Sequence, residues 1–104
     1  MNSIRVEELA GALQASEPGL LDVREAWEFD LCHIPGSVLI PLGELSTRLG
    51  EIPANRPLVV ICHHGVRSEM AQHYLLQQGM TEVLNLAGGI AEWAAQIDPD
   101  MPHY

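Results

Sequence analysis

The stretch from Pro57 to Ser68 reads Pro-Leu-Val-Val-Ile-Cys-His-His-Gly-Val-Arg-Ser. Its first part is a short apolar run that ends abruptly at Cys62, a pattern typical of a buried strand. A small loop containing Gly65 follows, and an amphipathic helical pattern opens near Arg67. The sequence therefore predicts a strand, a tight loop and a helix, with one cysteine held at the end of the strand.

This position favours an ionised, nucleophilic thiol at Cys62. A helix N-terminus carries partial positive charge, which stabilises a thiolate that faces it. The loop from Cys62 to Arg67 is short enough to turn its backbone N–H groups toward one point, and Gly65 permits the backbone angle of a tight turn. We therefore expect a thiolate at neutral pH, with Arg67 positioned to hold an incoming oxyanion or a persulfide on Cys62. The alternative, a small buried hydrophobe, leaves Gly65 and Arg67 unexplained.

Outward from this stretch, strand patterns alternate with helix patterns along the chain. The strand patterns are apolar runs, which indicates a parallel sheet covered by helices on both faces. Ligands bind at the carboxyl ends of the strands in such sheets, and both Arg24 and Cys62 are expected at that rim. The expected strands are residues 20–23, 38–40, 58–61 and 83–86, and the expected helices are residues 6–13, 25–31, 42–49, 66–78 and 88–97.

Two helices carry more detailed expectations. The helix that follows the Cys62 loop is expected to face the core with an apolar stripe. Gly88-Gly89 is expected to allow close packing of the last helix at its N-terminus. It is not expected to form a phosphate loop, because the glycine pattern and the lysine of such a loop are missing. The stripe consists of Val66, Met70, Ala71, Tyr74 and Leu75.

Composition excludes several classes of protein. The 104 residues predict one domain over residues 1–104, and 14 acidic against 5 basic side chains argue against nucleic acid or an anionic membrane as partner. There is no apolar run long enough to span a membrane, and the start of the chain is unlike a signal peptide. Two cysteines, Cys32 and Cys62, are too few for a secreted disulfide scaffold, so we expect a cytoplasmic protein.

Five segments resemble, in order, those of the single-domain rhodaneses. They are Leu21-Asp22-Val23-Arg24-Glu25, His33-Ile34-Pro35-Gly36-Ser37, Ile40-Pro41-Leu42, Cys62-His63-His64-Gly65-Val66-Arg67-Ser68 and Leu86-Ala87-Gly88-Gly89-Ile90 with Trp93. The resemblance covers nearly the whole chain. It implies an α/β rhodanese-like fold, with a central, mostly parallel five-stranded sheet flanked by helices on both faces.

The resemblance also implies a sulfurtransferase with Cys62 as its catalytic nucleophile and no cofactor or metal. Cys62 would take a sulfane sulfur from a small-molecule donor, thiosulfate or a polysulfide or persulfide, and pass it to cyanide, a thiol or a protein thiol. The segment from Cys62 to Arg67 would be the six-residue active-site loop. The residues expected to contact substrate are His63, His64, Gly65, Val66, Arg67 and, at the rim, Arg24.

Other functions remain as alternatives. One is a non-catalytic rhodanese-like binding module, although such domains usually lack the cysteine that is present here. The related phosphatases and arsenate reductases place arginine one residue later, where this chain has Ser68, so the smaller loop favours a sulfur atom over a tetrahedral oxyanion. His63 and His64 stand where thiosulfate-type enzymes often carry permanent positive charges, so the charge of the pocket would depend on pH.

Three further residues have structural alternatives to a role in catalysis. Arg24 is expected to pair with Asp22 and fix the loop after the first buried strand, more than to contact substrate. Cys32 could resolve a Cys62 persulfide as a disulfide, and His33 is expected to be a hydrogen-bonded turn residue. The spacing of cysteine and histidine in the chain is not that of a structural zinc site.

Overall fold

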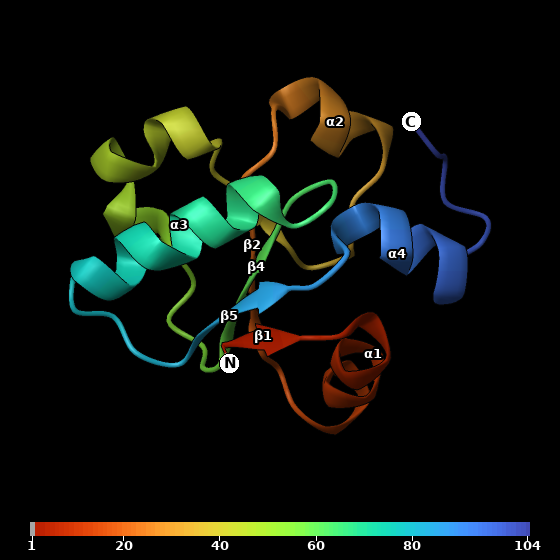
Figure 1. Ribbon diagram of the computed structural model, residues 1–104, viewed down its shortest axis with the longest axis horizontal. Coiled ribbons are helices and arrows are strands. Elements are labelled where there is room, and N and C mark those ends of the chain that lie inside the picture. Colours follow the sequence, from red (N-terminus) through yellow and green to blue (C-terminus); the bar gives the residue numbers. More distant parts are fainter. Residues whose placement is uncertain (1) are drawn as a thin grey trace.

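The computed structural model describes residues 2–104 and places five strands in one sheet (Figure 1). The strand order is β1-β5-β4-β2-β3, and every neighbouring pair is parallel. The strands are β1 Ser3–Ile4, β2 Gly19–Asp22, β3 Val38–Leu39, β4 Leu58–Ile61 and β5 Val83–Leu86. The predicted α/β fold with a five-stranded sheet is confirmed, and the sheet is wholly parallel.

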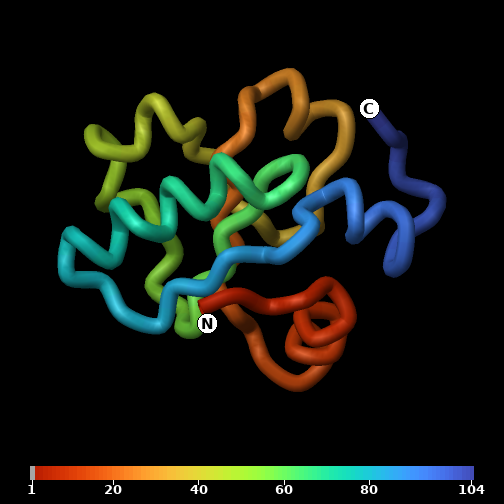
Figure 2. Tube along the Cα trace, in the orientation of Figure 1, coloured from red at the N-terminus to blue at the C-terminus, as the bar shows by residue number. Residues whose placement is uncertain are grey.

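Helices cover both faces of this sheet, as expected for a parallel sheet. One face packs on α1 and α4, and the other packs on α3 and the 3-10 helix η1, an arrangement that the tube in Figure 2 shows from the same direction. The helices are α1 Val6–Ala15, α2 Ala26–Leu31, η1 Leu42–Thr47, η2 Leu49–Glu51, α3 Val66–Gln77 and α4 Gly89–Gln96.

The central strand β4 explains where the cysteine lies. All four of its residues are buried, and their side chains alternate between the two cores: Val59 and Ile61 face α1 and α4. Leu58 and Val60 face α3, and Cys62 continues that alternation beyond the end of the strand. The thiol therefore points to the α3 side, where the loop and the start of α3 enclose it.

The helix expected over residues 42–49 is instead the pair of 3-10 helices η1 and η2. Gly43 and Gly50 lower the α-helical propensity of this segment. Leu42, Leu45 and Leu49 still pack on the same core, although Arg48 separates the two 3-10 helices. Strand β1 lies at the edge of the sheet and has two residues, too few to produce an apolar run, so no sequence pattern predicted it.

The predicted inner face of α3 is partly wrong. Val66 and Met70 are 69% and 58% exposed, whereas Ala71 and Leu75 are fully buried. The buried stripe is completed by two polar side chains, Ser68 and Gln72. Apolar periodicity does not detect buried polar residues, so the predicted stripe was rotated toward Val66 and Met70.

Within residues 2–104, no helix has the length and apolar character needed to cross a membrane.

Candidate active site

The loop after β4 places one backbone N–H and one hydroxyl against the Cys62 sulfur. Cys62 is 1% exposed, and the backbone N–H of Gly65 donates to its Sγ at 3.0 Å. Gly65 has a φ of 110°, a left-handed angle that glycine adopts without strain. The backbone thus turns back on the sulfur, although only the N–H of Gly65, and not the several N–H groups expected from the sequence, donates to Sγ in the described part of the chain. An N–H directed at Sγ stabilises negative charge there.

Ser68 supplies a second contact to the sulfur. Its Oγ lies 3.3 Å from Cys62 Sγ and also donates to Asn85 Oδ1 on β5. Asn85 Nδ2 in turn donates to the carbonyl oxygen of Gly65 at 3.2 Å. Strand β5 therefore holds both the first turn of α3 and the tip of the loop in place.

The start of α4 fixes the other side of the loop. The N–H of Ile90 donates to the carbonyl oxygen of Cys62 at 2.9 Å, and the N–H of Ala91 donates to that of His63 at 3.0 Å. A Cβ on Gly89 would lie 2.5 Å from the His63 oxygen, so only glycine fits. Close packing of the helix N-terminus, predicted from Gly88-Gly89, is confirmed.

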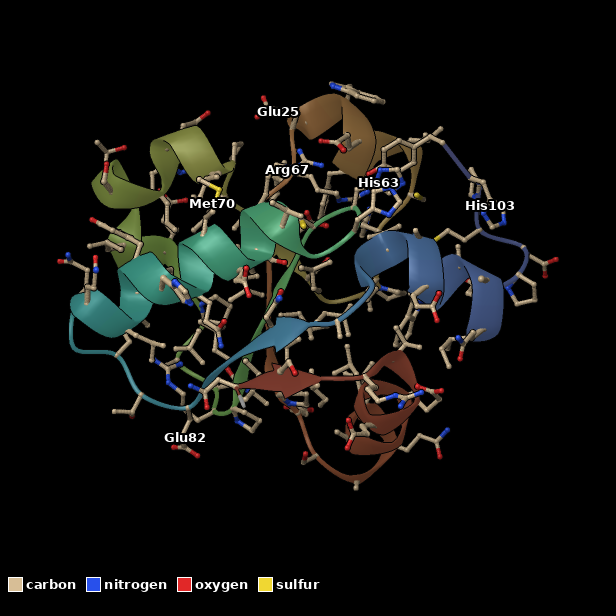
Figure 3. All side chains as sticks on the ribbon, in the orientation of Figure 1. Glu25, His63, Arg67, Met70, Glu82 and His103 are labelled. Atoms are coloured by element: carbon tan, nitrogen blue, oxygen red, sulfur yellow. The ribbon has the colours of Figure 1, made fainter. Side chains whose placement is uncertain are left out.

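Arg67 is held by a carboxylate from another helix. Its Nη1 and Nη2 donate to Glu28 Oε1 and Oε2 at 2.7 and 2.9 Å, and Figure 3 shows the Arg67 side chain directed toward α2. The Arg67 hydrogen bonds lower the pKa of Glu28 to about 2. The pKa of Arg67 is raised, chiefly by the hydrogen bonds to Glu28. Both groups are charged throughout the neutral range.

Tyr104, which follows α4 in the sequence, contacts this ion pair through its hydroxyl group. Its hydroxyl donates to Glu28 Oε2 at 2.9 Å and accepts from Arg24 Nη1 at 2.8 Å. Its ring stacks on His63, with centroids 3.9 Å apart and planes 9° apart. Burial raises the pKa of Tyr104 to about 12, so the phenol keeps its proton and remains a donor to Glu28 at neutral pH.

The two histidines of the loop differ in exposure. His64 is exposed, whereas His63 is half-buried between His64 and Tyr104. Burial, followed by the charge of His64, lowers the pKa of His63 below its ordinary value of 6.5. His63 is therefore neutral at neutral pH, and it becomes protonated only below pH 6.5.

Arg24 does not join the loop. It is fully buried, and its guanidinium bonds Asp22 Oδ2 at 2.8 Å and the carbonyl oxygen of Cys32 at 2.7 Å. Its third partner is Tyr104. The geometry favours the structural pair with Asp22 over the expected contact with substrate, because no face of the guanidinium is open to solvent.

Cys32 and His33 also lie apart from the loop. Cys32 is buried among the side chains of α1 and α4, the face of the sheet opposite to Cys62, and both cysteines are free thiols. His33 Nδ1 lies 2.8 Å from the carbonyl oxygen of Phe29, and its ring stacks on Phe29. His33 is hydrogen-bonded, as the sequence predicted, although the turn itself lies at Pro35 and Gly36. In the described part of the chain, no cluster of three or more potential metal ligands is found.

The model of the Rhodanese-like domain family matches residues 5–96 of this chain. The chain belongs to the rhodanese-like domain family. A solved rhodanese-related protein from Thermoplasma volcanium has 32% identity and a TM-score of 0.83, over 93% of this chain and 94% of its own. The fold and the family predicted from the sequence are confirmed.

Two curated relatives of this rhodanese-like domain carry names connected with sulfur. A "Sulfurtransferase" from Allochromatium vinosum is 41% identical over 95 residues, which are 90% of this chain and 89% of that protein. A "Putative sulfur carrier protein YrkF" from Bacillus subtilis is 43% identical over 79 residues, 76% of this chain but only 43% of that protein. The relatives support a sulfur-transfer role and leave the donor and the acceptor open.

Besides the contact of Ser68 with the sulfur, sequence reasoning missed three side chains of this rhodanese-like site. Asn85 had no local signal, because it lies within an otherwise apolar strand pattern. Glu28 stands three residues after Glu25, a spacing that a capping box at the start of α2 explains, and its second role toward Arg67 needs the tertiary fold. Tyr104 lies in a segment without helix or strand pattern, so only the structure brings it to the loop.

Proposed function

We propose that this rhodanese-like domain is a sulfurtransferase that carries the transferred sulfur as a persulfide on Cys62. The observation that supports this most strongly is the N–H of Gly65 donating to Cys62 Sγ at the end of β4. An N–H that donates to Sγ favours negative charge on the sulfur, and the thiolate is the reactive form of cysteine. A reducing, cytoplasmic setting would keep this thiol free.

In the first step the Cys62 thiolate attacks the sulfane sulfur of the donor. A Cys62–S bond forms, the S–S bond of the donor breaks, and the remainder of the donor leaves with the electron pair of that bond. The donor is thiosulfate, which leaves as sulfite, or a polysulfide or persulfide, which leaves as a shorter polysulfide or a thiolate. No cofactor is needed, because both bonds are between sulfur atoms.

In the second step an acceptor nucleophile attacks the outer sulfur of the persulfide and restores the Cys62 thiolate. The acceptor is cyanide, a small thiol or a protein thiol. Ser68 has one hydroxyl proton and two acceptors within reach, so it donates to Asn85 while Cys62 is protonated and to the sulfur when Cys62 is ionised. The other residues proposed to line the path of the substrate are His63, His64, Gly65, Val66 and Arg67.

Thiocyanate formation from thiosulfate and cyanide tests this proposal. Wild type is expected to turn over, Cys62→Ser is expected to lose turnover, and Cys32→Ser is the matched control because Cys32 lies on the other face of the sheet. Equal turnover by wild type and Cys62→Ser would exclude Cys62 as the nucleophile. If no donor forms a persulfide while the protein still captures a partner, the chain is a binding module instead.

A further inference from the structure

Arg67 carries the permanent positive charge of the loop, and its guanidinium forms an ion pair with Glu28. The two groups meet through two hydrogen bonds of 2.7 and 2.9 Å, and the Glu28 side chain is 5% exposed. A two-pronged bond between guanidinium and carboxylate is among the strongest polar contacts in proteins. The positive charge of Arg67 is therefore balanced by the carboxylate of Glu28 before any donor binds.

Glu28 is itself held from every side. Oε1 accepts from the N–H of Glu25 and from Arg67, and Oε2 accepts from the hydroxyl of Tyr104 and from Arg67. Withdrawing Arg67 toward a bound anion would leave a buried carboxylate without its counter-charge, which is strongly unfavourable. The ion pair is therefore expected to persist when a donor binds.

The other permanent positive charge near the loop, that of Arg24, is matched as well. The side chains whose charge acts on His63 are those of exposed His64, Glu28, Arg24 and Arg67. Arg24 is paired with buried Asp22. His63 itself is neutral at neutral pH, because burial lowers its pKa. Each of these two arginines thus has its own carboxylate. A thiolate at Cys62 repels an anionic donor, and this repulsion increases with the negative charge of the donor.

We propose that Glu28 is a specificity-determining residue that makes the site select donors by charge. It favours a thiol persulfide, which brings one negative charge at its sulfane end, over the thiosulfate dianion. This rests on the proposed function of Cys62. The favoured step is Cys62–S⁻ + R–S–S⁻ → Cys62–S–S⁻ + R–S⁻, in which one S–S bond forms, one breaks and the charge is unchanged.

The test compares two donors on the full chain. The rate constants for persulfide formation on Cys62 are measured by intact mass with thiosulfate and with the persulfide of 2-mercaptoethanol, whose organic part is uncharged. Glu28→Gln keeps the shape of the side chain and leaves Arg67 without a counter-charge. The ratio of the thiosulfate rate to the persulfide rate is expected to rise roughly tenfold in this variant.

Glu69→Gln is the matched control, because it removes the same charge from an exposed position two residues after Arg67. A rise in the ratio with Glu28→Gln and not with Glu69→Gln supports the proposal. An unchanged ratio, or an equal rise in both variants, overturns the role of Glu28 while leaving Cys62 as nucleophile. If neither donor adds sulfur to wild-type Cys62, the proposed function itself fails.

A measurement on wild type covers the case in which Glu28→Gln does not fold. Salt screens charge–charge forces over about 10 Å at 0.1 M. If the site has no unmatched positive charge, the thiosulfate rate stays constant or rises as salt increases from about 0.02 to about 0.2 M. A steep fall of the rate over that range means that thiosulfate is attracted by free positive charge, and this overturns the proposal.

Discussion

Ser68 connects the Cys62 thiol to strand β5 of the sheet. Its buried hydroxyl links Cys62 Sγ on one side and Asn85 Oδ1 on the other. The sequence led to Cys62, Gly65 and Arg67 because their types and spacing carry the chemistry. It did not lead to a role for Ser68 at the sulfur, because one serine in a helical pattern looks like a surface residue until the fold buries it.

Replacing Ser68 with alanine removes a donor to the thiolate and leaves Asn85 Oδ1 short of a partner. We expect sulfur transfer to slow by roughly ten- to a hundred-fold, because a hydrogen bond to a charged group contributes about 1.5–3 kcal/mol. We also expect a loss of about 1–3 kcal/mol in the free energy of unfolding. Steady-state kinetics and urea unfolding measure the two effects. Ser46→Ala, at an exposed position in η1, should leave both unchanged, and unchanged kinetics in Ser68→Ala would remove its hydroxyl from the mechanism.

Helix α4 is the element that shapes the loop without contributing a side chain to the sulfur. Its first N–H groups bind the carbonyl oxygens of Cys62 and His63, and Gly89 permits that approach. The pattern Gly-Gly before an apolar helix predicted close packing but not its target. Loop and helix are far apart in the sequence, and their contact depends on β4 and β5 being neighbours in the sheet.

Replacing Gly89 with alanine tests this contact. The new Cβ would clash with the backbone oxygens of Cys62 and His63, and the φ of 59° disfavours any side chain. We expect a loss of about 2–4 kcal/mol of stability together with slower sulfur transfer. Gly11→Ala in α1 is the control, since nothing lies within 4 Å of its Cβ, and there we expect a gain of about 0.5–1 kcal/mol. Thermal unfolding of both variants gives the comparison, and a neutral Gly89→Ala would contradict the close contact.

At the scale of the whole molecule, Glu28 joins three distant parts of the chain. It connects α2 to Arg67 at the start of α3 and to Tyr104 after α4. Apolar runs and apolar periodicity predicted four of the five strands, the parallel sheet and most helices, because those patterns are local. The Glu28 cluster depends on side chains separated by 39 and 76 residues, and polar contacts at such separations leave no periodic signal.

This cluster makes a prediction for acid stability. Glu28 has a pKa of about 2 in the fold against an ordinary value of 4.5, so its stabilisation is present above pH 4.5 and is lost as the pH falls from there toward 2. The amount is on the order of 3 kcal/mol. Urea unfolding at a series of pH values should show the difference between wild type and Glu28→Gln shrinking across that range. The same comparison with Glu69→Gln should show no such change, and a pH-independent difference for Glu28→Gln would contradict the ion pair.

The central claim is that a sulfur atom resides on Cys62 during transfer. The most direct measurement treats the protein with donor in the absence of any acceptor, traps persulfides with an alkylating agent and maps them by peptide mass spectrometry. We predict one added sulfur, on the peptide that contains Cys62 and not on the one that contains Cys32. Sulfur found only on Cys32, or no sulfur on Cys62 with any donor, would contradict the account.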